Sequence, residues 1–206
     1  MNEQPKGAGG RGIFVRYAEA RHLVLDIETL GFSKPAVIAS IGAVVWGFRT
    51  GVTAKFSALI DVRGFSVRPE TESVLWWLRQ SDAARRRTFG GEKREPLAGA
   101  LARFFAFCRE QSPNYYWGNS PDFDFGHLEA WAASPADVPW RFSQLRDIRT
   151  FCCEDLVTLE EKREILRRRT QHVAIEDAKA EAAFLSLAIE RITGERAFSL
   201  REPDSL

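Results

Sequence analysis

Short apolar segments in the first third of the chain have the composition of β-strands. They cover residues 22–28, 37–46 and 53–60, and each is rich in β-branched or aromatic side chains. A glycine-containing turn at residues 47–51 separates the second segment from the third. Because this connection is short, we expect these two strands to pair antiparallel.

The rest of the chain shows helical spacing interrupted by short strands. Residues 69–87 begin with a proline and acidic residues, and Val74, Trp77 and Leu78 define one apolar stripe. A final helix over residues 173–193 carries an apolar stripe and is followed by a glycine suited to a C-cap. Further predicted elements are helices at 96–110, 125–133 and 147–156 and strands at 114–117 and 142–145. This order indicates an α/β domain with a mixed central sheet.

Length and composition bound the domain organisation. The 206 residues fit one domain, predicted over 19–195, with a flexible leader at 1–18 and a tail at 196–206. Hydrophobic residues make up 45% of the chain, which suits a packed core. No apolar run approaches the ~20 residues that span a bilayer, so no membrane partner is expected. The three cysteines form neither a disulfide framework nor a zinc site, and a cytoplasmic location is expected; they are Cys108, Cys152 and Cys153.

The overall charge does not by itself indicate a nucleic-acid-binding protein. There are 29 basic and 28 acidic residues, which gives a net charge of +1. Basic residues cluster at 85–87 and 162–169, and each cluster taken alone is best explained as a solvated helix face or loop. Arg146 and Arg149 could contact phosphate or pair with nearby acids, and pairing is the favoured interpretation.

Acidic residues that could hold a metal ion occur at three places in the chain. Asp26 and Glu28 end the first predicted strand, and because side chains alternate along a strand they point to the same face. A bound Mg²⁺ would relieve their repulsion, whereas the alternative is a pair of solvated groups at a strand end. Asp122 and Asp124 lie near the start of a predicted helix, where a carboxylate could equally serve as a cap.

The third place is the start of the last predicted helix, where His172 stands five residues before Asp177. Five helical residues rotate a side chain by roughly 140°, so the two would not share a face if both were helical. We therefore expect His172 on the preceding loop and Asp177 on the helix. His22 and His127 are interpreted as structural or solvated histidines.

Taken in order, the acid pair, the later Asp124 and the His-x4-Asp spacing resemble the DEDDh exonucleases of the RNase H-like fold. Relatives in this family include RNase T and the proofreading exonuclease subunits of DNA polymerases. The segments VIASIGAVVW, GNSPDFDF and LRDIRTF are similar in particular to compact phage and bacterial 3′-to-5′ exonucleases. The resemblance implies an RNase H-like fold with a mixed five-stranded central sheet flanked by helices. Its pattern also places the third acid after an aromatic residue, which selects Asp124 over Asp122.

The same resemblance implies a site for two Mg²⁺ ions, with Mn²⁺ able to substitute. Asp26 would bridge both ions, Glu28 and Asp177 would complete the site of the ion that carries the attacking water, and Asp124 would support the second ion. His172 would accept the proton from that water, a role suited to its unperturbed pKa of about 6.5.

Candidate substrate contacts lie beside the acids. The resemblance assigns Thr29 and Leu30 to the pocket for the terminal nucleotide, and Asn119 is a further polar candidate. Trp76 and Trp77 occupy adjacent helical positions that diverge by about 100°, so at most one is expected to reach substrate.

The expected activity is hydrolysis of single-stranded DNA or RNA from the 3′ end to nucleoside 5′-monophosphates, with DNA slightly favoured and RNA trimming as the alternative. Two different classes of protein would share this fold: an inactive nucleic-acid-binding module and an RNase H-like endonuclease. The complete set of acids and His172 argue against the inactive module. Oligomeric state, a homodimer included, is left open.

Overall fold

The computed structural model describes residues 16–91 and 93–198, which fold around one five-stranded sheet. The strand order is β3-β2-β1-β4-β5, with strands β1 (Arg21–Thr29), β2 (Ile38–Gly47), β3 (Gly51–Leu59), β4 (Tyr115–Gly118) and β5 (Leu145–Asp147). The pairs β1–β2 and β2–β3 are antiparallel, whereas β1–β4 and β4–β5 are parallel. The predicted mixed five-stranded sheet is confirmed.

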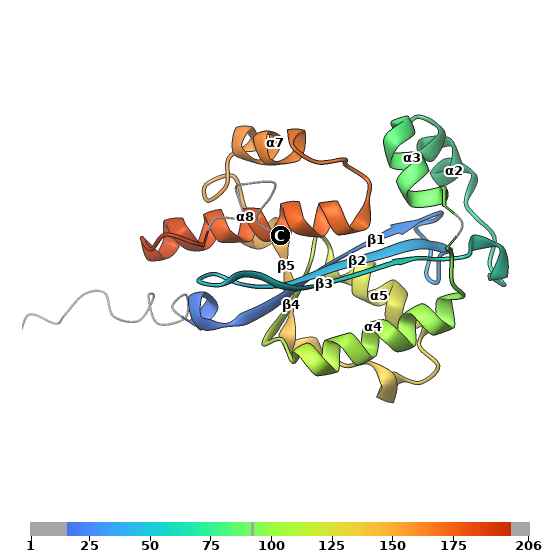
Figure 1. Cartoon of the computed structure of the whole chain (residues 1–206), viewed down its shortest axis with the longest axis horizontal. Coiled ribbons are helices and arrows are strands. Elements are labelled where there is room, and N and C mark those ends of the chain that lie inside the picture. The colour runs from blue at the N-terminus through green and yellow to red at the C-terminus, as the bar shows by residue number, and fades with distance from the viewer. Residues whose placement is uncertain (1–15, 92, 199–206) are drawn as a thin grey trace, which may run out of the picture.

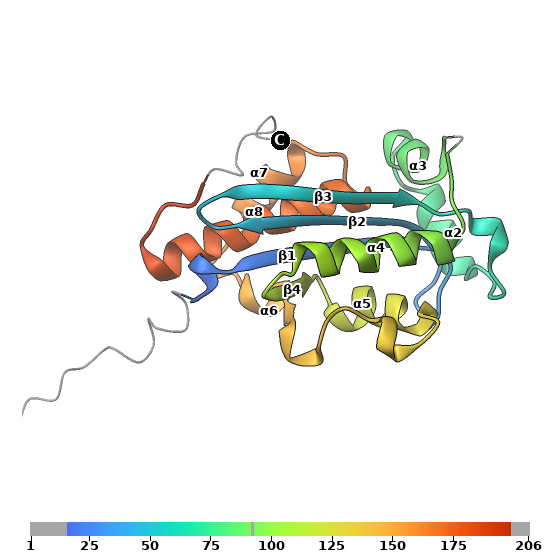
Figure 2. The same ribbon diagram turned by 60° about the horizontal axis from the view of Figure 1, so that its bottom comes forward.

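Helices cover both faces of this sheet (Figures 1 and 2). The elements are α4 (Leu97–Gln111) and α5 (Pro121–Trp131) on one face, α8 (Ala174–Thr193) on the other, and α2 (Thr71–Leu78) and α3 (Asp82–Phe89) beyond the end of β1. Each face of the sheet has its own cluster of buried apolar side chains. The two flanking layers expected for an RNase H-like fold are therefore present.

Strand β1 contributes to both clusters, because its side chains alternate between the two faces. Leu25 and Ile27 belong to the cluster under α4 and α5, whereas Val24 belongs to the cluster under α8. Asp26 and Glu28 follow Val24 at intervals of two residues. The two carboxylates therefore share the α8 side of the sheet, as the alternation predicts.

A glycine on β2 allows α8 to approach the sheet beside these acids. Gly42 is the residue paired with Asp26 across the strands. A Cβ at Gly42 would lie 2.2 Å from the carbonyl carbon of Ala174 and 2.2 Å from the nitrogen of Ile175, both in the first turn of α8. Only a residue without a side chain lets the helix backbone come this close, and the approach brings Asp177 into the neighbourhood of Asp26.

The helix predicted over residues 69–87 is two helices, α2 and α3, so that prediction was wrong. Ser81 separates them, and its Oγ accepts a hydrogen bond from the backbone of Ala84 as the N-cap of α3. The predicted apolar stripe also divides: Trp77 is buried, whereas Leu78 is 63% exposed. Because the chain turns after Leu78, the second half of the segment packs in a different direction.

The segment between β4 and α8 differs most from the prediction. The strand expected at 142–145 is a 3₁₀ turn, η3 (Phe142–Gln144), followed by β5, and the helix expected at 147–156 is the single turn α6 (Ile148–Phe151). The remaining short elements are η1 (Val62–Gly64) and η2 (Pro135–Asp137). Helix α5 begins at Pro121, four residues before the predicted start, because the proline occupies its first turn.

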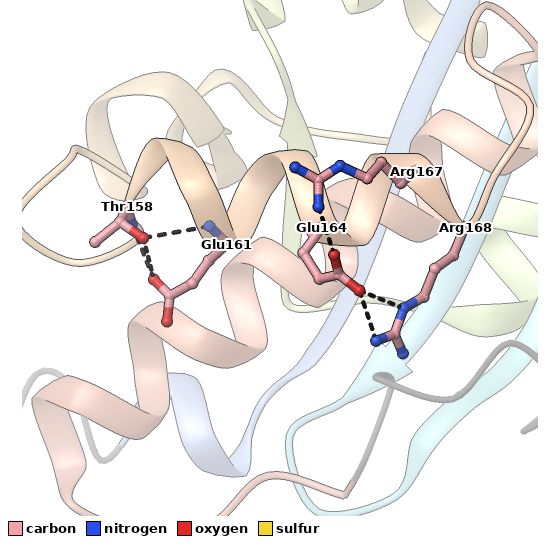
Figure 3. A network of polar contacts seen from close by, with 5 residues as sticks. All are labelled: Thr158, Glu161, Glu164, Arg167 and Arg168. Atoms are coloured by element: carbon pink, nitrogen blue, oxygen red, sulfur yellow. Dashed lines mark hydrogen bonds and ion pairs between the residues drawn. The ribbon is translucent and has the colours of Figure 1, made fainter.

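Helix α7 (Leu159–Arg167) was not predicted, and most of the 162–169 basic cluster lies on it. Thr158 and Glu161 cap each other's backbone at its start, as Figure 3 shows. Arg167 and Arg168 both pair with Glu164, at 2.9 and 2.8 Å. These pairs on an exposed helix face agree with the interpretation of this cluster as solvated surface.

Only the last residues of the predicted leader and the first of the predicted tail fall within the described part of the chain. Tyr17, from the leader, packs its ring at a tilt against that of Tyr115, and its carbonyl accepts a hydrogen bond from His22 Nε2 at 2.8 Å. Trp117 Nε1 donates to the other ring nitrogen of His22, at 2.9 Å. Burial lowers the pKa of His22 to about 4. These contacts support its interpretation as a structural histidine.

Across the described residues, no helix has the length and apolar character needed to cross a bilayer.

We predict that Gly42→Ala destabilises the protein by about 3 kcal/mol, because the new methyl group must push the first turn of α8 away from β2. The melting temperature, followed by circular dichroism, should fall by several degrees. Gly64→Ala is the matched control, since a Cβ there meets nothing within 4 Å. Equal melting temperatures for the two variants would contradict the close approach of α8.

Candidate active site

A pocket of about 470 Å³ opens at the end of β1, between the sheet, helix α2 and the loops that precede α5 and α8. Its wall contains acidic, aromatic and hydroxyl side chains together with one arginine and one histidine. The lining residues are Asp26, Ile27, Glu28, Thr29, Phe32, Ser73, Trp76, Asn119, Ser120, Phe123, Asp124, Arg149 and His172. Among the residues predicted to form the site, Asp26, Glu28, Asp124, His172, Thr29 and Asn119 therefore meet here.

The carboxylates are held close together and largely out of water. Glu28 is 7% exposed and Asp124 is 4% exposed, whereas Asp26 is partly exposed but keeps its Oδ2 atom buried without a hydrogen-bond partner among the described residues. Asp177 lies within one turn of the start of α8, and an oxygen of this residue, one of Glu28 and a ring nitrogen of His172 lie within 4.8 Å of one another. Acids from three separate segments thus converge.

Burial and mutual repulsion oppose the charged forms of these acids. Desolvation first, and then the charges of Glu28, Glu181, Asp124 and Asp177, raise the pKa of Asp26 well above its usual range. Glu28 shows the same effect, with desolvation ahead of Asp177 and Asp124. Desolvation raises the pKa of Asp124 to about 7 and that of Asp177 to about 6.

The residues of this pocket fit divalent cations such as Mg²⁺ or Mn²⁺. Carboxylate oxygens are the ligands that these ions prefer, and a cation would satisfy the unpartnered Oδ2 of Asp26 while offsetting the repulsion among the acids. Without a cation, the same group of carboxylates would be costly to ionise at neutral pH.

His172 lies on the loop before α8, as predicted, and is fixed from several sides. Its backbone is left-handed, with φ of 60°, and its N–H donates to Oδ2 of Asp177 at 2.7 Å. Thr88 Oγ1, from α3, donates to the carbonyl of His172 at 2.9 Å. The ring of Trp76 meets the imidazole edge-on at 4.7 Å. Burial lowers the pKa of His172, which keeps the imidazole neutral near pH 7.

One predicted position, that of Leu30, differs from the expected arrangement, whereas the tryptophan pair agrees with it. Leu30 does not line the pocket: it packs in a small core cluster with Val37 and Trp77. Its N–H donates to the carbonyl of Val37, and its carbonyl accepts from the N–H of Glu70, so both backbone groups already have partners within the protein. Of the tryptophan pair, Trp76 lines the pocket, whereas Trp77 is buried and donates its Nε1 to the carbonyl of Thr29 at 2.9 Å.

Asp122 and His127 do not line the pocket. The Asp122 side chain is 91% exposed and forms an ion pair with Lys34 at 2.7 Å, so Asp124 is the acid that enters the pocket. His127 is buried, and its Nδ1 accepts a hydrogen bond from the backbone of Ala36 at 3.2 Å. The interpretation of His127 as structural is supported.

Sequence reasoning missed a fifth carboxylate, that of Glu181. It is 4% exposed, and its charge acts on Asp26. Residues four apart on a helix share a face, so the spacing from Asp177 could have revealed it. It also missed the aromatic wall of the pocket formed by Phe32 and Phe123.

A sheet of this topology, with acids at the end of its first strand and further acids on α5 and α8, is that of a DEDD-type 3′-5′ exonuclease of the RNase H-like fold. The family described as the 3′-5′ exoribonuclease Rv2179c-like domain matches residues 21–189. The chain therefore belongs to that family. A comparison with curated protein sequences finds no match.

Three solved structures with the same fold are distant from this chain in sequence. Exonuclease I superposes with a TM-score of 0.58 at 17% identity, over 85% of this chain and 42% of its own. Pop2p of S. pombe, in a form with bound Mg²⁺ and Mn²⁺, superposes with a TM-score of 0.56 at 13% identity, over 89% of this chain and 88% of its own. E. coli exonuclease I in complex with a dA16 oligonucleotide gives a TM-score of 0.52 at 17% identity, over 85% and 42%. This chain thus spans about two fifths of exonuclease I.

We predict that the metal-free protein, kept in EDTA, is less stable at pH 8 than at pH 5.5. The folded state binds the protons of Asp124 and Asp177 more tightly than the unfolded state does, so this stability is lost as the pH rises through about 6 and about 7. The melting temperature should fall by about 5 °C over this range. Asp124→Asn should make the melting temperature depend less steeply on pH. Asp122→Asn, at an exposed position, should leave this dependence unchanged. An Asp124→Asn profile as steep as that of wild type would contradict the assignment.

Proposed function

We propose that this chain shortens single-stranded RNA from its 3′ end in a reaction that requires divalent metal ions and releases nucleoside 5′-monophosphates. The observation that carries the proposal is the convergence of buried acids from β1, α5 and α8 with His172 around one pocket. The pocket also has exposed aromatic side chains, which offer stacking surfaces for unpaired bases.

Four acids would hold two Mg²⁺ ions, or Mn²⁺ in their place: Asp26, Glu28, Asp124 and Asp177. Ions bound there stabilise the charge on the attacking and leaving oxygens and make hydroxide available near neutral pH. The buried Oδ2 of Asp26 and the raised pKa values of the acids support this assignment. The form of Pop2p with Mg²⁺ and Mn²⁺ supports divalent ions as the cofactor of this fold.

His172 would act as the general base. Its imidazole is neutral and adjoins Glu28 and Asp177, and it would take the proton of the attacking water. The water oxygen then bonds to phosphorus while the bond from phosphorus to the 3′ oxygen of the preceding nucleotide breaks. The phosphate leaves on the 5′ position of the released nucleotide, and the shortened strand keeps a 3′-hydroxyl.

The choice of RNA over DNA rests on the family. Its description as an exoribonuclease favours RNA, which was the alternative to the slight preference for DNA drawn from the sequence. The hydroxyl groups of Ser73 and Ser120 line the pocket and are available donors for a 2′-hydroxyl contact. Single-stranded DNA is the second candidate substrate, supported by the complex of E. coli exonuclease I with dA16.

We predict that, with Mg²⁺, the protein releases mononucleotides from a 3′-labelled single-stranded RNA and leaves a circular single strand uncut. Asp26→Asn should abolish the release, because it removes a charge at the centre of the acid cluster. Initial rates on RNA and DNA of the same sequence measure the preference, and the RNA rate should be higher. Failure of wild type to release mononucleotides from either strand would reject the proposed function, and cutting of the circle would indicate an endonuclease.

We predict that His172→Ala lowers kcat by about 10²- to 10⁴-fold, which is the usual contribution of a general base. Affinity for Mn²⁺, measured by titration calorimetry without nucleic acid, should stay nearly unchanged because the four carboxylates remain. A parallel loss of Mn²⁺ affinity and of kcat would mean that His172 acts as a metal ligand instead.

A further inference from the structure

A chain of hydrogen bonds runs from the buried Glu181 on α8 to the exposed Arg149, the single arginine among the described residues of the pocket. Asn119, in the loop between β4 and α5, donates its side-chain amide to Glu181. The Oδ1 atom of Asn119 accepts a hydrogen bond from Nε of Arg149 at 3.1 Å. The oxygen acceptor and the nitrogen donor of an asparagine side chain lie in one plane, on either side of the Cβ–Cγ bond, so these two partners together fix its orientation.

Glu181 is the buried end of this chain. It is 4% exposed, and its Oε2 atom has no hydrogen-bond partner among the described residues. The negative charges of the four predicted acids would balance the positive charges of two divalent ions. The negative charge of Glu181 is in excess of that balance. Desolvation raises the pKa of Glu181 and that of Asp124, and the positive charge of Arg149 offsets part of each rise. Arg149 therefore lies on the Asp124 side of the pocket.

Arg149 is the only arginine or lysine among the described residues that line the pocket. Its Nε is used by Asn119, while neither terminal nitrogen donates to another described residue. A guanidinium with both terminal nitrogens available matches two oxygens of one phosphate. If it were not held through Nε, the same group would be drawn onto the neighbouring carboxylates and would compete with the metal ions for them.

We propose that Arg149 binds a phosphate of the substrate strand and that Asn119 and Glu181 position it for this contact. The proposal deepens the proposed function, on which it rests, by assigning the recognition of the substrate backbone. It also gives Asn119 a different part from the direct substrate contact predicted from the sequence. Arg149 would touch the substrate, whereas Asn119 and Glu181 act through Arg149.

The test is the binding of a fluorescent single-stranded RNA oligonucleotide to the full chain in EDTA, followed by anisotropy at several salt concentrations. Arg149→Ala should weaken binding about ten-fold, as expected for loss of a charge-assisted hydrogen bond to phosphate. It should also reduce the slope of log Kd against log salt by about 0.7, the value for one phosphate contact on a single strand. Arg141→Ala, which removes the same charge at an exposed position outside the pocket, should change neither.

The positioning part is tested by double-mutant cycles. Asn119→Ala and Glu181→Ala should each weaken binding, but neither should add to the effect of Arg149→Ala, because the three side chains act through one contact. Glu181→Gln keeps an acceptor for Asn119 and should restore binding to near the wild-type affinity. Additive effects, or a Glu181→Gln variant as weak as Glu181→Ala, would overturn the positioning role.

Failure of this proposal is distinct from failure of the proposed function. An Arg149→Ala variant with wild-type affinity and salt slope would overturn the phosphate contact, even if wild type releases mononucleotides and Asp26→Asn does not. Calorimetric titration of Arg149→Ala with Mn²⁺ alone should give wild-type affinity. A loss of Mn²⁺ affinity would instead assign Arg149 to the metal site and would also overturn the proposal.

Discussion

The repulsion among buried carboxylates is the constraint on which the rest of this structure depends. Asp26 and Glu28 on the sheet, Asp124 on α5 and Asp177 on α8 raise the cost of ionising one another, and burial raises it further. Packing on both faces of the sheet must offset that cost. The second condition is geometric, because α8 can carry its acid to β1 only where Gly42 leaves room for the helix backbone. The close contact between α8 and the sheet thus brings together the acids that repel one another, and its packing helps to offset their repulsion.

Much of the fold could be predicted from the sequence because elements such as β1 and α8 have regularly spaced apolar residues. The β1 alternation placed Asp26 and Glu28 on one face, and the apolar stripe of α8 gave its bounds to within one residue, up to Gly194 with φ of 72°. The separation of His172 from Asp177 followed from helical geometry alone. These predictions succeeded because local periodicity and burial agree in those segments.

The errors arose where tertiary contacts outweigh the local pattern. Residues 69–87 read as one helix, yet the break at Ser81 turns α3 toward the His172 loop, a partner far away in the chain. Leu30 comes two residues after Glu28, but the strand has ended at Thr29 and the side chain of Leu30 turns into the core. Glu181 was overlooked because a carboxylate on a helix is ordinarily assigned to solvent. Its four-residue spacing from Asp177 was the one signal in the sequence that could have revealed it.

The attachment of His172 has a consequence for how activity responds to temperature. The acids belong to the sheet and to helices packed directly on it, whereas the carbonyl of His172 is tied to Thr88 on α3, and its ring touches Trp76 on α2. These two short helices stand beyond the end of β1, apart from the two main layers (Figure 1). Heating that loosens this outlying pair would displace the imidazole while the acids remain assembled. With His172 as the proposed general base, turnover would then decline below the temperature of global unfolding, and the loss would be reversed on cooling.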